Sequence, residues 1–254
     1  MTPRGRTLPL SLPRRAVNDV LHFARRIPTV PVQRLVDVSR LAAARRHLTT
    51  PVGWCAILTK AFAQVCTDVP ELRRAYLRFP RERLYEHPFS VASIAVERRF
   101  EGEPGVFFAN VPRPDEMPLP ELEAAIRAYK TRPVEEAFRL SLRFFRLPRL
   151  VRRGLWWYLL NVRGSRKAEF LGTFGVSAYS ALGAESLHPL SPLTCLLTYG
   201  VIAADGRVPI RVVYDHRVFD GVAVARALTR LDEVLGTAVL CELTRLATPA
   251  AGAA

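Results

Sequence analysis

The strongest structural constraint in the sequence is a β-hairpin near its C-terminal end. Two apolar runs, LLTYGVIA (196–203) and VPIRVVY (208–214), are separated by a segment that contains Asp205-Gly206. An Asp-Gly pair between two such runs favours a tight turn that folds one strand back on the other. Apolar residues at helical spacing follow between Val222 and Leu235, so the hairpin is expected to lead into a helix packed against it.

The remainder of the chain alternates irregularly between helical and β-rich segments. A second hairpin is expected over 89–111, around a Gly/Pro turn. Spacing and capping residues predict helices over 11–26, 39–47, 50–66 (capped by Thr50) and 118–130, a strand over 30–38, and two or three strands between 170 and 217. Helices mixed with antiparallel hairpins indicate the α+β class. We expect one domain over 1–243 and a flexible tail over 244–254.

Several classes of protein are excluded by composition. No apolar run reaches the roughly eighteen residues that a membrane span needs, and the first fifteen residues lack the apolar segment of a signal peptide, so a cytoplasmic location is expected. The four cysteines lack the paired spacing of a zinc site and fall in apolar segments, which predicts reduced core residues and no metal; they are Cys55, Cys66, Cys195 and Cys241.

The net charge of +14, carried mainly by arginine, calls for an anionic partner or a local cause. Nucleic acid, an acidic membrane surface and a phosphate-bearing cofactor are each compatible with it. No nucleic-acid-binding motif accompanies the charge, so nucleic acid is not the expected partner.

The stretch YDHRVFDG (214–221) is the candidate functional motif. His216 follows the predicted strand and Asp220 precedes the predicted helix, so both lie on a short connection of the kind that often holds catalytic groups. A structural interpretation is also open: Asp220 would cap the helix, Gly221 would ease the turn, and His216 would be a buried histidine with satisfied hydrogen bonds.

This stretch resembles the active-site segment of the dihydrolipoamide acyltransferases, the core enzymes of the 2-oxoacid dehydrogenase complexes. Chloramphenicol acetyltransferases and peptide-synthetase condensation domains share only HxxxDG, and Asp215 favours the first branch. Other segments also resemble that family, over roughly residues 8–243: LPLSLPRRAV (8–17), PELRRAY (70–76), GTFGVSAYSALG (172–183) and RLDEVLGTAVLCEL (230–243). The resemblance implies a chloramphenicol acetyltransferase-like fold, with a mixed sheet flanked by helices.

The resemblance also implies a role for each matching residue. His216 would be the general base and Ser177 the hydroxyl that stabilises the oxyanion, while Asp220 would be structural and paired with Arg14. A second interpretation of Ser177 is a strand-edge serine bonded to backbone. The family forms homotrimers with active sites between subunits, so a homotrimer is expected here.

The expected activity is a stand-alone transfer of an acyl group between coenzyme A and a thiol, hydroxyl or amine. The catalytic region starts near Met1 and leaves no room for a lipoyl domain, so acyl-coenzyme A is the expected donor and this chain is expected to carry no lipoyl group. The alternative is a non-catalytic trimeric scaffold. Family members dock trimers through a C-terminal knob; here AVLCEL (238–243) is followed by eleven residues, Thr244–Ala254, which predicts an isolated trimer.

One segment, 137–168, has no counterpart in the resembling family and is interpreted as an insertion. It contains nine Arg or Lys residues, no acidic residue, and Trp156 and Trp157. Pro148 and Gly154 are expected to divide it into two short helices. Three interpretations are open: a helix in the interface of an anionic membrane, a helix packed on the core, or a lining of arginines for the phosphates of coenzyme A.

Overall fold

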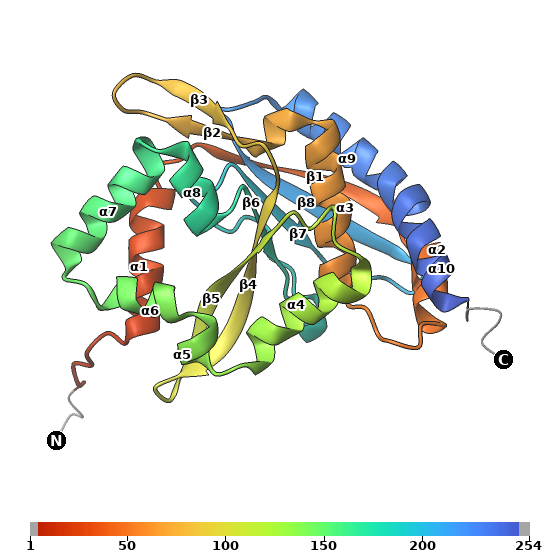
Figure 1. The fold of residues 1–254 in the computed structure, drawn as a ribbon, viewed down its shortest axis with the longest axis horizontal. Helices are drawn as coiled ribbons and strands as arrows, with labels where there is room; N and C mark the ends of the chain where they lie inside the picture. The colour runs from red at the N-terminus through yellow and green to blue at the C-terminus, as the bar shows by residue number, and fades with distance from the viewer. Residues whose placement is uncertain (1–4, 249–254) are drawn as a thin grey trace.

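A six-stranded mixed sheet lies at the centre of the molecule in the computed structural model, which describes residues 5–248 (Figure 1). Its strand order is β1-β8-β7-β6-β4-β5, where the strands are β1 (Thr29–Asp37), β4 (Val91–Phe100), β5 (Glu103–Pro112), β6 (Phe174–Ser177), β7 (Cys195–Tyr199) and β8 (Arg207–Asp215). β6 runs parallel to both of its neighbours, β4 and β7, whereas the β1–β8, β7–β8 and β4–β5 pairs are antiparallel. A separate small sheet pairs β2 (Arg74–Leu77) with β3 (Arg83–Glu86). The α+β class is confirmed.

Both predicted hairpins are present. The loop between β7 and β8 ends at Gly206, whose φ of +84° lies in the left-handed region that glycine tolerates best. The β4–β5 hairpin turns over Glu101 and Gly102, both with positive φ. The two-residue turn therefore precedes Pro104, which lies inside β5.

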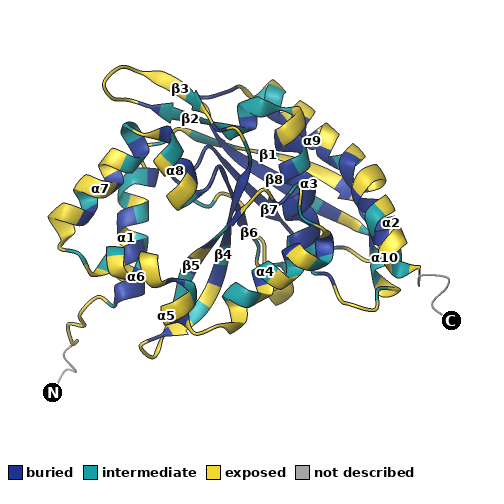
Figure 2. Ribbon diagram, viewed as in Figure 1, coloured by how far each residue is buried: buried dark blue, intermediate teal, exposed yellow. Residues whose placement is uncertain are grey.

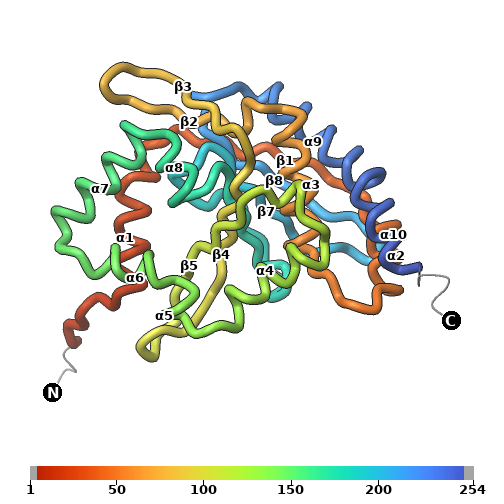
Figure 3. The backbone as a smooth tube through the Cα atoms, viewed as in Figure 1, coloured from red at the N-terminus to blue at the C-terminus, as the bar shows by residue number. Residues whose placement is uncertain are grey.

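Helices cover the sheet in two groups (Figures 1 and 3). The first group contains α3 (Trp54–Asp68), which is buried along most of its length (Figure 2). α4 (Leu119–Thr131) and α9 (Gly221–Val234) pack on α3, whereas α2 (Ser39–Arg46) and α10 (Leu240–Ala247) pack on each other. The second group lies beside β4 and β5 and consists of α1 (Leu12–Ala24), α5 (Val134–Ala137), α6 (Arg139–Arg146), α7 (Arg149–Asn161) and α8 (Gly164–Leu171).

The start of α3 differs from the prediction. Thr50 does not cap the helix, because residues 51–53 are not helical and Gly53 occupies the N-cap position. The Gly53 amide donates a hydrogen bond to Glu123 of α4. A side chain distant in sequence therefore satisfies this helix end.

The C-terminal prediction also needs correction. α10 continues to Ala247, so residues 244–247 are helical and not a flexible tail; residues 249–254 lie outside the described part of the chain. Cys241, on α10, is exposed and not a core residue, whereas Cys66 and Cys195 are buried. No cysteine in the described residues forms a disulfide.

The segment 137–168 forms α6, α7 and most of α8. Pro148 separates α6 from α7 as predicted, but Gly154 lies within α7 and does not break it. Trp156 is buried and stacks on Phe23 of α1 with ring centroids 6.1 Å apart. The interpretation of a helix packed on the core is therefore correct for this face of α7.

The opposite face of α7 is exposed and apolar. It carries Leu150, Val151, Leu155, Trp157 and Tyr158. None of the helices in residues 5–248 is both long enough and apolar enough to cross a bilayer.

A buried ion pair fixes α7 against α1. The Asp19 carboxylate accepts a hydrogen bond from Nε of Arg152, and the two side chains are 2% and 7% exposed. Arg152 also donates to the carbonyl oxygens of Phe145 and Leu147, so one guanidinium joins α1, α7 and the turn before α7. A charge that loses its partner in such a place costs several kcal/mol.

We predict that Asp19→Asn lowers the free energy of unfolding by about 3–5 kcal/mol, because it leaves the Arg152 guanidinium buried without a countercharge. Urea unfolding followed by circular dichroism measures the loss. The matched control is Asp232→Asn, which removes the carboxylate of the exposed Arg34–Asp232 pair and should cost at most about 1 kcal/mol. Equal losses in the two variants would contradict the prediction.

Candidate functional site

His216 lies immediately beyond β8, where the strand turns toward α9. Its backbone amide donates to the carbonyl oxygen of Pro28, and the turn is closed by a hydrogen bond from the Val218 amide to the Asp215 carbonyl. The side chain is 47% exposed, so His216 is not a buried core histidine. The imidazole is accessible to a substrate.

Aromatic side chains pack beneath this turn and support it. The ring of Tyr214 stacks on Phe219 with centroids 5.4 Å apart, and the His216 ring lies 5.6 Å from Tyr214. A Cβ on Gly221 would approach the Tyr214 hydroxyl to 3.2 Å. Glycine at this position lets the start of α9 pack closely against the tyrosine.

Asp215 and Arg217, on either side of the histidine, form a second support. Arg217 donates from Nε and Nη2 to the two carboxylate oxygens of Asp215 at 2.9 and 2.7 Å, and its guanidinium lies 4.4 Å from the centroid of the Tyr76 ring. Asp215 is buried and also accepts the Arg217 backbone amide. Bidentate geometry of this kind restrains both side chains, which fixes the backbone that carries His216.

The predicted Arg14–Asp220 pair is not formed within the chain. Asp220 is the N-cap residue of α9, is 85% exposed, and directs its Oδ1 toward Nδ1 of His216 at 3.5 Å. Arg14 is exposed in the first turn of α1 and joins no ion pair among the described residues. The reason is distance: β8 ends beside the strand that follows α1, and the first turn of α1 lies about 15 Å further along the helix axis, at 1.5 Å per residue.

Ser177 is the last residue of β6 and lines an apolar cavity of about 640 Å³. The cavity lies between α1, α6 and the sheet, with walls that include Val20, Phe108 and Leu196. In the described part of the chain the Ser177 hydroxyl forms no hydrogen bond to backbone, so the interpretation of a backbone-bonded serine is wrong. The hydroxyl is free to donate to a ligand.

His216 and Ser177 do not meet within one chain. The strand register aligns Tyr214 with Cys195 and Cys195 with Phe174. These three aligned residues form a row across β8, β7 and β6. His216 lies two residues past Tyr214 along β8, and Ser177 lies three residues past Phe174 along β6, which points the opposite way. With a rise of about 3.3 Å per residue and strands about 4.8 Å apart, the two side chains are separated by roughly 15–20 Å. The His216 imidazole therefore does not reach Ser177 within one chain.

Lys167, on α8, is a buried titratable group that the sequence analysis missed. The residue is 5% exposed. Its pKa is lowered to about 8, chiefly by desolvation; Asp215 opposes this shift and Arg217 adds to it. Lys167 therefore lies in the field of the Asp215–Arg217 pair. A lone lysine in a basic segment gave no sequence signal for this placement.

The fold relates the chain to known proteins. No protein-family model and no curated sequence matches it. The structure of dihydrolipoamide acetyltransferase from Azotobacter vinelandii superposes with a TM-score of 0.69 at 19% identity, covering 94% of this chain and 95% of that one. A probable dihydrolipoamide acetyltransferase from Listeria monocytogenes gives 0.67 at 18% identity, covering 91% and 94%. A chloramphenicol acetyltransferase gives 0.51 at 14% identity, covering 87% and 94%.

This chain has the chloramphenicol acetyltransferase-like fold. The fold implied by the HxxxDG stretch is thus confirmed over most of the chain. In the Azotobacter enzyme a serine, a histidine and an asparagine have been examined for their role in the catalytic mechanism. The histidine and the asparagine are four residues apart in that enzyme. His216 and Asp220 have the same spacing in this chain, with a carboxylate in place of the amide.

The pKa of Lys167 predicts a pH dependence of stability. Below pH 8 the folded and unfolded states both hold this proton, and folding bears the full cost of burying the charge. Between pH 8 and 10.5 the folded state holds fewer protons, so stability rises with pH. The stability of the wild type relative to Lys167→Met should therefore increase across this interval by on the order of 3 kcal/mol.

Urea unfolding at a series of pH values measures this change. Lys130→Met removes an exposed lysine and is the matched control. A difference between the wild type and Lys167→Met that stays constant from pH 7 to 10.5 would contradict the placement of Lys167.

Proposed function

We propose that this chain is an acyltransferase whose active site forms between two copies, with His216 of one copy facing Ser177 of the next. The observation that carries the proposal is the separation of two chemically complementary half-sites on one acetyltransferase fold, an exposed imidazole and a largely buried serine hydroxyl. The imidazole is accessible on a rigid turn, and the hydroxyl is free at the wall of an apolar cavity.

The chemistry assigns each group a step. His216 takes the proton of a thiol, hydroxyl or amine acceptor as that atom attacks the thioester carbonyl. Because Asp220 faces Nδ1, Nε2 is the nitrogen available to the acceptor. The carbonyl oxygen becomes an oxyanion, to which the Ser177 hydroxyl donates a hydrogen bond. The intermediate then collapses, the carbon–sulfur bond breaks, and the leaving thiolate takes the proton from His216.

An acyl-coenzyme A thioester is the proposed donor. The acyl part of this donor matches the site, because an apolar cavity of about 640 Å³ that reaches Ser177 suits a hydrocarbon chain. A site open to both solvent and cavity lets the thioester approach from one side and its acyl chain extend into the other.

The proposed assembly is a homotrimer of about three times the 28.5 kDa chain. The second candidate function is a non-catalytic scaffold with the same fold. A scaffold would need the turn and the aromatic rings that pack beneath it in order to fold, but it would need neither an exposed imidazole nor a hydroxyl without a hydrogen-bond partner. These two features favour the enzyme.

We predict that His216→Ala reduces acyl transfer or acyl-coenzyme A hydrolysis by about 10²–10⁴, the loss typical of a general base. A thiol-release assay with acyl-coenzyme A thioesters of increasing chain length provides the measurement. The side chain is exposed, so the melting temperature and the oligomer mass should not change. Full activity in the variant would contradict the catalytic role.

We further predict complementation between inactive variants. Ser177→Ala and His216→Ala are each expected to be inactive alone, but subunits mixed by unfolding and refolding together should regain activity, because some interfaces then combine an intact serine with an intact histidine. The control is the double variant refolded with either single variant, which should regain none. A mixture that stays inactive while its subunits exchange would contradict an active site between copies.

A further inference from the structure

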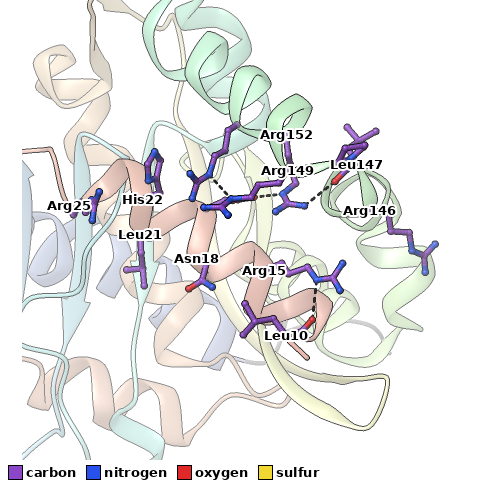
Figure 4. Close-up of a pocket in the computed structure, with 13 residues that line it drawn as sticks. Leu10, Arg15, Asn18, Leu21, His22, Arg25, Arg146, Leu147, Arg149 and Arg152 are labelled. Carbon is purple, nitrogen blue, oxygen red and sulfur yellow. Dashed lines mark hydrogen bonds and ion pairs between the residues drawn. The ribbon is translucent and has the colours of Figure 1, made fainter. Parts of the chain in front are cut away.

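A second cavity, of about 730 Å³, lies on the other side of α1, between this helix and the turn that joins α6 to α7. We call it the arginine groove, because six arginines line it: Arg15, Arg25, Arg146, Arg149, Arg152 and Arg153. Figure 4 shows Arg15, Arg146, Arg149 and Arg152 around the space between the two elements. The groove is separate from the cavity that holds Ser177 and shares only Leu21 with it.

In the described residues only two of the six groove arginines pair with a carboxylate, although Glu101 and Glu103 line a neighbouring pocket together with Arg15 and Arg146. Asp19 is the one carboxylate among the lining residues, and it is already bound by Arg152 and approached by Arg153 at 3.8 Å. The other four arginines of the groove join no ion pair in residues 5–248. Guanidinium groups that line one groove with few carboxylates repel one another, and a bound anion would reduce that repulsion.

Two further observations support an anion site. The Nε atom of Arg153 is buried and has no hydrogen-bond partner among the described residues, and such donors are rare in folded proteins. The pKa of His22, on the same face of α1, is lowered by desolvation and then by Arg153, Arg26 and Arg25. The groove is therefore electropositive where it is partly shielded from solvent.

We propose that the arginine groove binds a phosphate-bearing ligand. Arg15, Arg146 and Arg149 present guanidinium groups without carboxylate partners. A phosphate offers up to two charges and three acceptor oxygens, and guanidinium groups bind such oxygens in bidentate geometry. A single carboxylate ligand would leave most of this charge unmatched. The inference does not depend on the proposed acyl transfer.

The phosphate has two sources that the groove chemistry alone does not separate. One is a soluble phosphate ester; the other is the headgroup of an anionic phospholipid. The exposed apolar face of α7 begins at Leu150, which is 86% exposed and directly follows Arg149. A lipid headgroup in the groove would thus place the bilayer beside this face, and a soluble ester would leave it in solvent.

The test compares two arginine pairs that carry the same charge. Arg146→Gln/Arg149→Gln removes two exposed arginines that line the groove, and neither makes an ion pair that folding could lose. Arg143→Gln/Arg163→Gln, the control, removes two exposed arginines of the same segment that do not line it. Pyrophosphate binding is measured by calorimetry at low ionic strength, and vesicle binding by flotation with phosphatidylglycerol–phosphatidylcholine and with pure phosphatidylcholine.

Pyrophosphate binding that weakens about tenfold or more in the groove variant and less than threefold in the control supports a soluble phosphate ligand, because the groove variant loses charge-assisted hydrogen bonds that the control keeps. The same pattern for phosphatidylglycerol vesicles supports a lipid headgroup. The proposal is overturned if neither probe binds the wild type, or if the two variants weaken binding equally, since general charge would then account for it.

Discussion

The parallel placement of β6 between β4 and β7 is the constraint on which the site depends. β8 runs antiparallel to β7 and therefore antiparallel to β6, so the ends of β6 and β8 lie at opposite edges of the sheet. Ser177 and His216 each follow from the end of one of these strands. The sheet thus separates Ser177 from His216 within one chain, and the proposed active site between copies rests on this separation.

Each half-site has a different kind of support. The histidine turn is held by polar and aromatic contacts: the bidentate Asp215–Arg217 pair, the Tyr214–Phe219 stack and the close approach at Gly221. The serine is held by strand pairing on both sides, at the wall of an apolar cavity. A rigid polar turn suits proton transfer, because the base must keep its orientation. An apolar wall suits the binding of an acyl chain.

The helices α6 and α7 form one side of the fold and do not reach the histidine turn. The Asp19–Arg152 pair and the stack of Trp156 on Phe23 attach them to α1. This attachment forms one wall of the Ser177 cavity from α6 and one wall of the arginine groove from the α6–α7 turn. The basic charge of the segment is consequently divided between a buried structural role, in Arg152, and a solvent-accessible cavity.

The sequence by itself determined the local structure and the histidine motif. Asp205-Gly206, the period of apolar residues and HxxxDG act over a few residues, so the hairpins, most helices and the position of His216 between β8 and α9 could be predicted. Pairings between distant residues were decided only by the tertiary structure. Asp19 binds Arg152, Arg14 stays apart from Asp220, Lys167 is buried near Asp215, and Gly154 remains helical because α7 packs through Trp156. Burial and ion pairing depend on which elements the fold brings together, and no local pattern encodes that.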